Sequence, residues 1–131
     1  AEFSCGKVDA VCGIESRGYL FGIAIAVALD VPFVLIRKKG KLPPPFVGQQ
    51  YDLEYGSAEI EMRTGQIKPG QRILIHDEIL TTGETTENAA KIVEKQTAIV
   101  SQFSYLISLK ELAGEARLKK FDAEVHQILT Y

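Results

Sequence analysis

The sequence has few cysteines, no long apolar run and no visible signal peptide. Its two cysteines, Cys5 and Cys12, form neither a CxxC pair nor a set with metal-ligand spacing, so we expect reduced thiols rather than a disulfide framework. The longest apolar stretch, residues 19–29, is too short to span a bilayer. These absences predict a cytoplasmic protein with no membrane partner.

The sequence also lacks a strong excess of either charge. Fifteen Lys and Arg residues against 17 Asp and Glu give a formal net charge of -2, which provides no electrostatic footprint for nucleic acid. The basic residues at 37–39 and 41 form a local cluster that suits a small polyanion, although a solvated loop would look the same. No repeat, Ser-His-Asp arrangement or GxGxxG motif is present, and 131 residues predict one domain over residues 1–131.

The first third of the chain has the pattern of a βαβ unit. Residues 7–14 form an apolar run typical of a buried parallel strand, residues 18–29 have the composition of a helix, and residues 33–37 predict a second strand. Pro32 disfavours a helical residue before it and therefore marks the end of the helix. Small residues in the helix would permit close packing on the sheet: Gly22, Ala24, Ala26 and Ala28.

A different pattern follows in the middle of the chain. Residues 40–48 are expected to be a loop, and the alternation of polar and apolar residues over 50–63 predicts an antiparallel hairpin with one exposed face, projecting from the sheet. Further on, the sequence predicts strands at 99–109 and 124–129 with a short helix at 111–120 between them. The expected fold is therefore α/β, a mostly parallel sheet flanked by helices, with a β-hairpin flap over about 40–65.

The most informative segment is residues 72–85, RILIHDEILTTGET. A buried strand ends on the adjacent carboxylates Asp77 and Glu78, a hydroxyl-rich turn follows, and residues 85–95 have helical spacing. Loop amides and a helix N-terminus attract phosphate, while carboxylates accept hydrogen bonds from hydroxyls. The segment predicts a site for a phosphorylated sugar. His76, inside the strand, is expected to be a hydrogen-bonded strand residue, and it forms no constellation with His126.

This segment resembles the phosphoribosyl-pyrophosphate (PRPP) motif of the type I phosphoribosyltransferases. The resemblance extends over residues 8–131, is greatest to family members that use adenine, and rests on four blocks in the family's order. They are GIESRGYLFG at 13–22, IRKKGKLP at 36–43, YDLEYG at 51–56 and the motif itself. The resemblance implies a type I phosphoribosyltransferase fold and purine salvage, with adenine and PRPP converted to AMP and pyrophosphate in the presence of Mg²⁺.

The resemblance also implies a role for the acidic pair. Asp77 and Glu78 would hold the ribose hydroxyls and stabilise the oxocarbenium-like centre that develops at C1. Mg²⁺ would be held mainly by PRPP oxygens, with Asp77 assisting directly or through water. The family usually has Asp where this chain has Glu78, and the extra methylene shifts that carboxylate.

The turn after the strand would bind the 5-phosphate. By resemblance its residues are Thr81, Thr82, Gly83, Glu84 and Thr85. Many adenine enzymes have Gly where this chain has Glu84. A carboxylate about 6 Å from a phosphate charge costs roughly 3 kcal/mol at an effective dielectric near 20, so we expect the Glu84 side chain to point outward.

The remaining blocks would serve the leaving group and the base. By resemblance, pyrophosphate is bound by Ser16, Arg17, Arg37, Lys38 and Lys41. Glu54 in the flap is the expected acid/base for the purine ring nitrogen, and Tyr55 would order the closed flap. In the family the residue matching Arg37 can serve the neighbouring subunit's site, which implies a homodimer.

Several alternatives remain open at this stage. The acids could be a solvent-facing strand end, the threonines an ordinary helix cap, Arg17 a surface residue, and Glu54 an exposed hairpin residue without a catalytic role. Because the opening residues match little of the family's N-terminal hood over the purine, we expect that hood to be missing. The base could then be another purine, or the chain could be a catalytically impaired PRPP- or nucleotide-binding regulator.

Overall fold

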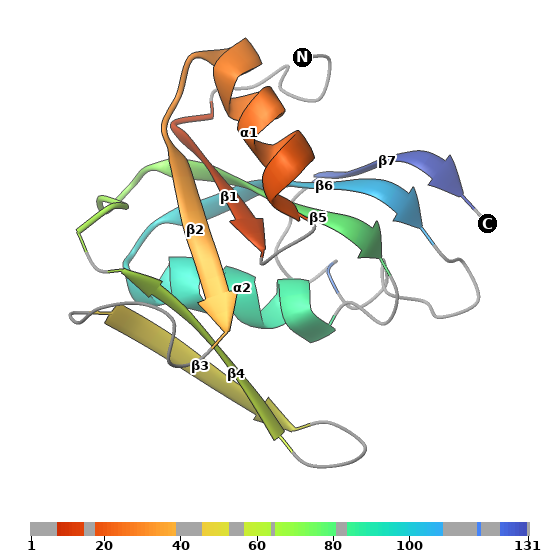
Figure 1. Cartoon of the computed structure of the whole chain (residues 1–131). Coiled ribbons are helices and arrows are strands. Elements are labelled where there is room, and N and C mark those ends of the chain that lie inside the picture. The colour runs from red at the N-terminus through yellow and green to blue at the C-terminus, as the bar shows by residue number, and fades with distance from the viewer. Residues whose placement is uncertain are drawn as a thin grey trace.

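A mixed sheet with one helix against each face forms the framework of the computed structural model (Figure 1). The structure describes residues 8–14, 18–38, 46–52, 57–63, 65–80, 84–108, 118 and 124–130. These residues form a seven-stranded sheet of order β3-β4-β2-β1-β5-β6-β7. Its elements are β1 (Ala10–Ile14), α1 (Gly18–Leu29), β2 (Phe33–Lys38), β3 (Phe46–Asp52), β4 (Ser57–Arg63), β5 (Arg72–Leu80), α2 (Glu84–Lys95), β6 (Ile99–Ser108) and β7 (Glu124–Thr130).

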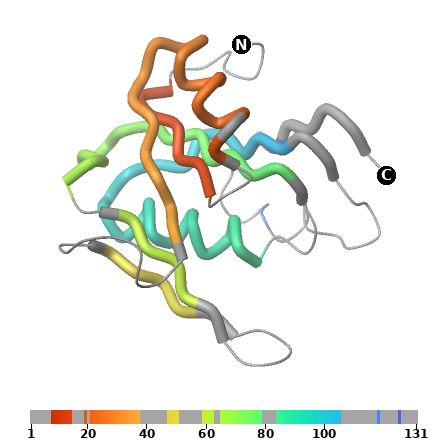
Figure 2. The backbone as a smooth tube through the Cα atoms, in the orientation of Figure 1, coloured from red at the N-terminus to blue at the C-terminus, as the bar shows by residue number. Residues whose placement is uncertain are grey.

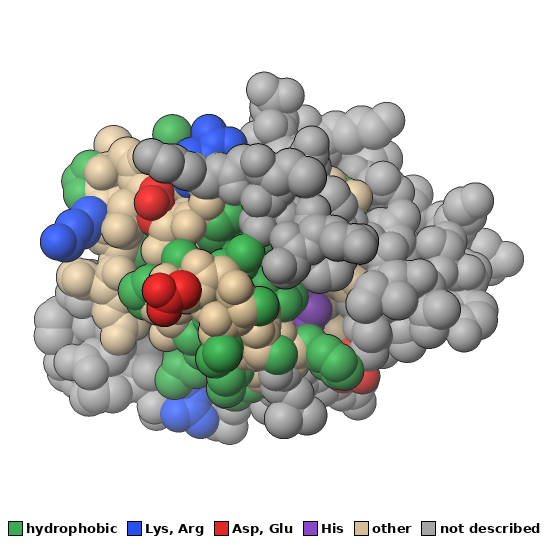
Figure 3. All heavy atoms as spheres, turned by 90° about the horizontal axis from the view of Figure 1, so that it is seen from above, with side chains coloured by type: hydrophobic (Ala, Val, Ile, Leu, Met, Phe, Trp, Pro, Cys, Tyr) green, Lys and Arg blue, Asp and Glu red, His purple; other side chains and the backbone are tan. Residues whose placement is uncertain are grey.

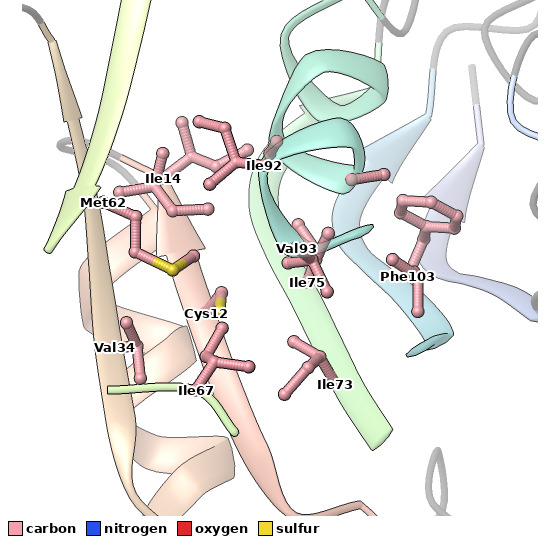
Figure 4. Packing of buried hydrophobic residues seen from close by; sticks show 14 of the residues in the cluster. Cys12, Ile14, Val34, Met62, Ile67, Ile73, Ile75, Ile92, Val93 and Phe103 are labelled. Carbon is pink, nitrogen blue, oxygen red and sulfur yellow. The ribbon is translucent and has the colours of Figure 1, made fainter. Parts of the chain in front are cut away.

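Five of the strands, from β2 to β7 in the sheet order, run parallel. Parallel strands with a helix over each face are apolar on both sides, and all five residues of β1 are buried. On β5, Ile73 and Ile75 pack with α2 in the larger core cluster (Figure 4). Leu74 packs with α1 in the smaller one. The predicted α/β fold with a mostly parallel sheet is confirmed.

Helix α1 has the predicted bounds but contacts the sheet through only part of its small-residue set. Gly22 and Ala26 are buried, while Ala24 and Ala28 are exposed, because residues four apart share a helix face and those two apart do not. A Cβ on Gly22 would lie 2.7 Å from the Phe33 ring, so glycine permits the close approach of α1 to β2. The predicted close packing through small residues therefore holds for Gly22 and Ala26 and is wrong for Ala24 and Ala28.

The β3–β4 hairpin is confirmed as antiparallel, but it is longer than expected and is joined to the main sheet. Strand β3 begins at Phe46, inside the segment predicted as loop, and β4 pairs antiparallel with β2 through Ile36–Met62 and Lys38–Ile60. Only its outer part, residues 50–52 and 57–59, continues past the end of β2. The trace in Figure 2 places the hairpin beside α2, where Lys95 Nζ donates to Gly48 O at 2.8 Å.

The two strands predicted in the last part of the chain are confirmed as β6 and β7, and the structure shows them on the other side of β5 and parallel to it. The predicted helix at 111–120 lies outside the described residues apart from Leu118, which is buried. Neither described helix is long and apolar enough to cross a membrane.

Candidate functional site

The sheet reverses its direction of growth between β1 and β5. From β1 the chain passes through α1 to β2 on one side, and from β5 it passes through α2 to β6 on the other. Ligands of open α/β sheets bind at such a switch point, outside the carboxyl ends of the strands. Residues 15–17 follow β1 and residues 81–83 follow β5, so both predicted ligand-binding turns leave the sheet at this point; the turns themselves lie outside the described residues.

The predicted strand does not end on the acidic pair, because β5 continues through Ile79 to Leu80 before the turn begins. Asp77 and Glu78 are both half-buried, and Asp77 Oδ1 accepts a hydrogen bond from the Glu78 amide at 2.8 Å. Because strand side chains alternate, Asp77 shares the α2 face with Ile75, and Glu78 shares the α1 face with Leu74. The pair therefore offers a carboxylate to each side of β5 and is not a fully solvent-exposed strand end.

Helix α2 begins directly after the turn. Its first two residues, Glu84 and Thr85, are half-buried and Thr86 is buried, while Asn88 Nδ2 donates to Glu84 O at 2.7 Å. A helix start of this kind presents backbone amides without intrahelical partners, which suits a phosphate. The outward orientation of the Glu84 side chain stays a prediction, because Thr81, Thr82 and Gly83 lie outside the described residues.

A buried tyrosine connects the acidic pair to the start of α2. Tyr105 of β6 lies opposite Asp77 in the sheet register, and its hydroxyl donates to Thr86 Oγ1 at 2.6 Å. Burial raises the pKa of Tyr105; the hydrogen bond to Thr86 opposes this and the charge of Asp77 adds to it, so the phenol stays protonated. Sequence reasoning missed Tyr105, because it stands in an apolar strand without a motif of its own.

On the opposite face of the sheet, His76 is almost fully buried. Its Nδ1 is 3.1 Å from Ser104 Oγ, its ring centroid is 6.4 Å from that of Phe21, and its Nε2 has no hydrogen-bond partner among the described residues. Burial lowers the pKa of His76 to about 4, against a smaller opposing effect of Ser104. The predicted strand histidine is thus hydrogen-bonded at one nitrogen only.

The expected pyrophosphate-binding residues are described only in part. Arg37 is half-buried near the end of β2 and lies directly opposite Glu61 of β4, which is 1% exposed. The prediction that this face of the hairpin is exposed is therefore wrong at Glu61. Strand β4 lies between β2 and β3, so Glu61 has strand neighbours on both sides. Opposite charges in such a cross-strand pair attract.

Lys38 is the last residue of β2, and its side chain is outside the described part of the structure. The other predicted residues of the pyrophosphate site and the flap also lie outside it: Ser16, Arg17, Lys41, Glu54 and Tyr55.

The fold and the site define a phosphoribosyl-transferring domain, and comparison with known proteins agrees. The family model described as the phosphoribosyl transferase domain matches residues 3–125. The adenine phosphoribosyltransferase of Parvibaculum lavamentivorans is 44% identical over 125 residues, which are 95% of this chain and 71% of that protein.

Two solved structures give the same answer. The adenine phosphoribosyltransferase of Rhodothermus marinus has 42% identity and a TM-score of 0.93, covering 99% of this chain and 73% of that one. The enzyme of Saccharomyces cerevisiae, complexed with D-2,5-dideoxy-2,5-imino-altritol 1,6-bisphosphate and adenine, has 36% identity and a TM-score of 0.88, covering 96% and 70%. The chain belongs to the adenine phosphoribosyltransferase family.

Proposed function

We propose that this chain is a purine salvage transferase that makes AMP and pyrophosphate from adenine and PRPP. One observation carries the proposal: the half-buried carboxylates of β5 and the N-terminus of α2 follow one another at the switch point of the sheet. Such an arrangement supports a site that offers acceptors for ribose hydroxyls next to amides for a phosphate. The yeast relative, whose complex contains adenine and a bisphosphate, supports the choice of base.

In the proposed reaction, a ring nitrogen of adenine forms a bond to C1 of the ribose while the bond from C1 to the pyrophosphate oxygen breaks. The nitrogen loses its proton, and pyrophosphate leaves with the electron pair of the broken bond. Positive charge develops on the ribose, and Asp77 and Glu78 would stabilise it while holding the 2- and 3-hydroxyls. Their half-buried positions strengthen this attraction, because fewer waters screen it.

The same carboxylates fit the Mg²⁺ that the family uses. Oxygen donors are the ligands this ion prefers, and a site with one or two carboxylates is completed by phosphate oxygens of the substrate. The ion would neutralise charge on the leaving pyrophosphate. Asp77 is the residue we expect to assist, either directly or through water.

The remaining assignments are proposals that rest on the family resemblance. Thr81, Thr82, Gly83, Glu84 and Thr85 bind the 5-phosphate, and Ser16, Arg17, Arg37, Lys38 and Lys41 bind pyrophosphate. Glu54 exchanges the proton of the purine ring nitrogen, and Tyr55 orders the closed flap. The outer part of the β3–β4 hairpin continues past the carboxyl end of β2, the sheet edge where we propose that the substrates bind. This supports the flap predicted over about 40–65.

We also propose a homodimer. Helix α1 exposes three large apolar side chains, those of Phe21 (46%), Ile23 (47%) and Val27 (75%). Figure 3 shows hydrophobic side chains gathered on the described part of this face. Contiguous apolar surface of this kind is typical of protein interfaces. A cytoplasmic location stays a prediction from the sequence.

The test is a turnover assay with protein, PRPP, Mg²⁺ and adenine, hypoxanthine or guanine in separate reactions, in which pyrophosphate release is measured. We expect release with adenine. Release only with hypoxanthine or guanine would contradict the adenine assignment. PRPP binding without release from any base would identify a regulator instead of an enzyme.

A charge-deleting variant connects the assay to the site. Asp77→Asn should lower kcat/KM by roughly 100-fold, because a negative charge proposed to stabilise the cationic centre is lost. Glu94→Gln is the matched control, since Glu94 is an exposed residue in the last turn of α2, far from the helix start. Equal activities of the two variants would remove Asp77 from the catalytic machinery.

A further inference from the structure

Two buried hydroxyls bridge the sheet and the helix beside the proposed ribose-phosphate site. Tyr105 is 1% exposed and Thr86 is 2% exposed, and the bond between them, at 2.6 Å, joins β6 to α2. Tyr105 packs in the larger core cluster on the same face as Ile75 and Phe103. Since Asp77 also lies on that face and is the register partner of Tyr105, one side chain adjoins both halves of the site.

The bond lies where it can determine the position of the helix start. Thr86 is the third residue of α2, within the turn whose amides lack intrahelical partners. The Asn88–Glu84 bond is internal to the helix and cannot set its position relative to the sheet. Farther along, Ile92 and Val93 fix the body of α2 in the core, whereas the residues that pack next to the first turn, Ala89 and Ala90, are small.

A small rotation of α2 about its well-packed end would move the first-turn amides away from Asp77. A substrate whose phosphate and ribose are covalently joined requires a fixed separation between the two groups that bind them. Positional errors of this kind weaken binding of the joined ligand even when every ligand-binding group is present.

We propose that Tyr105 is a positioning residue: through Thr86 it holds the phosphate-binding start of α2 at the distance from Asp77 that a phosphorylated ribose requires. The inference rests on the proposed function. It concerns the phosphoribosyl part of the ligand alone, and it leaves the pyrophosphate and base subsites unaffected.

The experiment compares Tyr105→Phe with the unmodified chain by calorimetric titration of AMP and, separately, of pyrophosphate with Mg²⁺. The variant keeps the buried ring and loses only the hydroxyl. We expect the Kd for AMP to rise about fivefold, the effect of one hydrogen bond, and the turnover assay to show a similar rise in the KM for PRPP. The Kd for pyrophosphate should stay within about twofold of its original value. A general structural effect would instead weaken the binding of both ligands.

Ser101→Ala is the matched control. Ser101 is a buried residue near the start of β6, away from the proposed site. Its hydroxyl donates to Ile73 O at 3.3 Å. Its loss should leave AMP binding unchanged. Thr86→Val removes the acceptor of the same hydrogen bond, and it replaces Tyr105→Phe in the comparison if that variant does not fold. The double variant should then be no weaker than either single one.

The proposal would be overturned by unchanged AMP binding in both single variants, by equal weakening of AMP and pyrophosphate binding, or by an equal loss in Ser101→Ala. Additive losses in the double variant would do the same. If the unmodified chain binds AMP but does not turn over, the proposed enzymatic function fails while the binding comparison still decides the role of Tyr105.

Discussion

The two helices have the same length of 12 residues but opposite characters. Helix α1, GYLFGIAIAVAL, has no charged residue and exposes Phe21, Ile23 and Val27. Helix α2, ETTENAAKIVEK, is amphipathic: it buries Ala89, Ala90, Ile92 and Val93 against the sheet and has acidic residues in its first turn and Lys95 in its last. Helix α1 therefore has more apolar surface than the sheet covers, whereas the apolar side chains of α2 named here are all buried.

The apolar surface of α2 serves packing within the chain, whereas we propose that the exposed apolar surface of α1 serves association. The buried face of α2 fixes a helix whose start belongs to the site, and its charged ends agree with the helix dipole. A helix that is apolar all round requires a second surface to bury its outer side, which for α1 we propose to be another copy of the chain. Three experiments can break or sharpen this contrast.

The largest effect is expected in the core under α2. Ile92 is 0% exposed, so Ile92→Ala should lower the free energy of unfolding by about 3 kcal/mol through lost burial and a residual cavity. Val27→Ala, at 75% exposure, should change it by less than about 0.5 kcal/mol. Urea unfolding at low protein concentration, where subunits dissociate, measures both. Similar losses in the two variants would show that α1 and α2 do not differ in this way.

A smaller effect is expected on the α1 face, where His76 lies next to Phe21. Burial lowers the pKa of His76 to about 4, so the unfolded chain binds a proton between pH 6.5 and 4 that the folded chain does not. The contribution of His76 to the free energy of unfolding is then fully present above pH 6.5 and is lost as the pH is lowered. We expect a decrease of about 2 kcal/mol from pH 7.5 to pH 5.

Urea unfolding without Mg²⁺ or substrates at these two pH values checks the His76 prediction. His76→Val should remove most of the difference between the two pH values, whereas Ser104→Ala, which keeps the imidazole buried, should preserve it. A pH difference that survives in His76→Val belongs to other groups.

The smallest effect concerns association. Val27→Glu places a charge on the exposed apolar face of α1 and should weaken a homodimer about tenfold or more, because an unpaired carboxylate would have to be desolvated. Sedimentation velocity over a range of protein concentrations measures this, and Glu94→Gln on the exposed side of α2 is the control. An unchanged dimer in Val27→Glu would place the interface elsewhere.

Local signals predicted those parts of the fold that depend on neighbours in the chain. The bounds of α1 and the strand–turn–helix order at 72–95 follow from periodicity, Pro32 and the helix-start pattern. The place of β4 between β2 and β3 could not be predicted in this way, because the local sequence pattern of a strand does not show which distant strand it pairs with. The burial of Glu61 was missed for the same reason.

The candidate site divides in the same manner. Asp77, Glu78 and the start of α2 could be found because they are consecutive in the chain. Tyr105 could not, since its meaning depends on β6 pairing with β5 in the register that sets it opposite Asp77. The lack of a hydrogen-bond partner for His76 Nε2 among the described residues is likewise a property of the packing around it.

The sequence by itself determined the chemistry: which carboxylates, hydroxyls and helix start are present, and in what order along the chain. Tertiary structure alone decided which of them lie together. It brought the ends of β1 and β5 to one edge, placed Asp77 and Glu78 on different faces and connected Tyr105 to Thr86. The physical reason is that side-chain chemistry and helix or strand periodicity are local properties, whereas strand order, register and burial arise from contacts between distant segments.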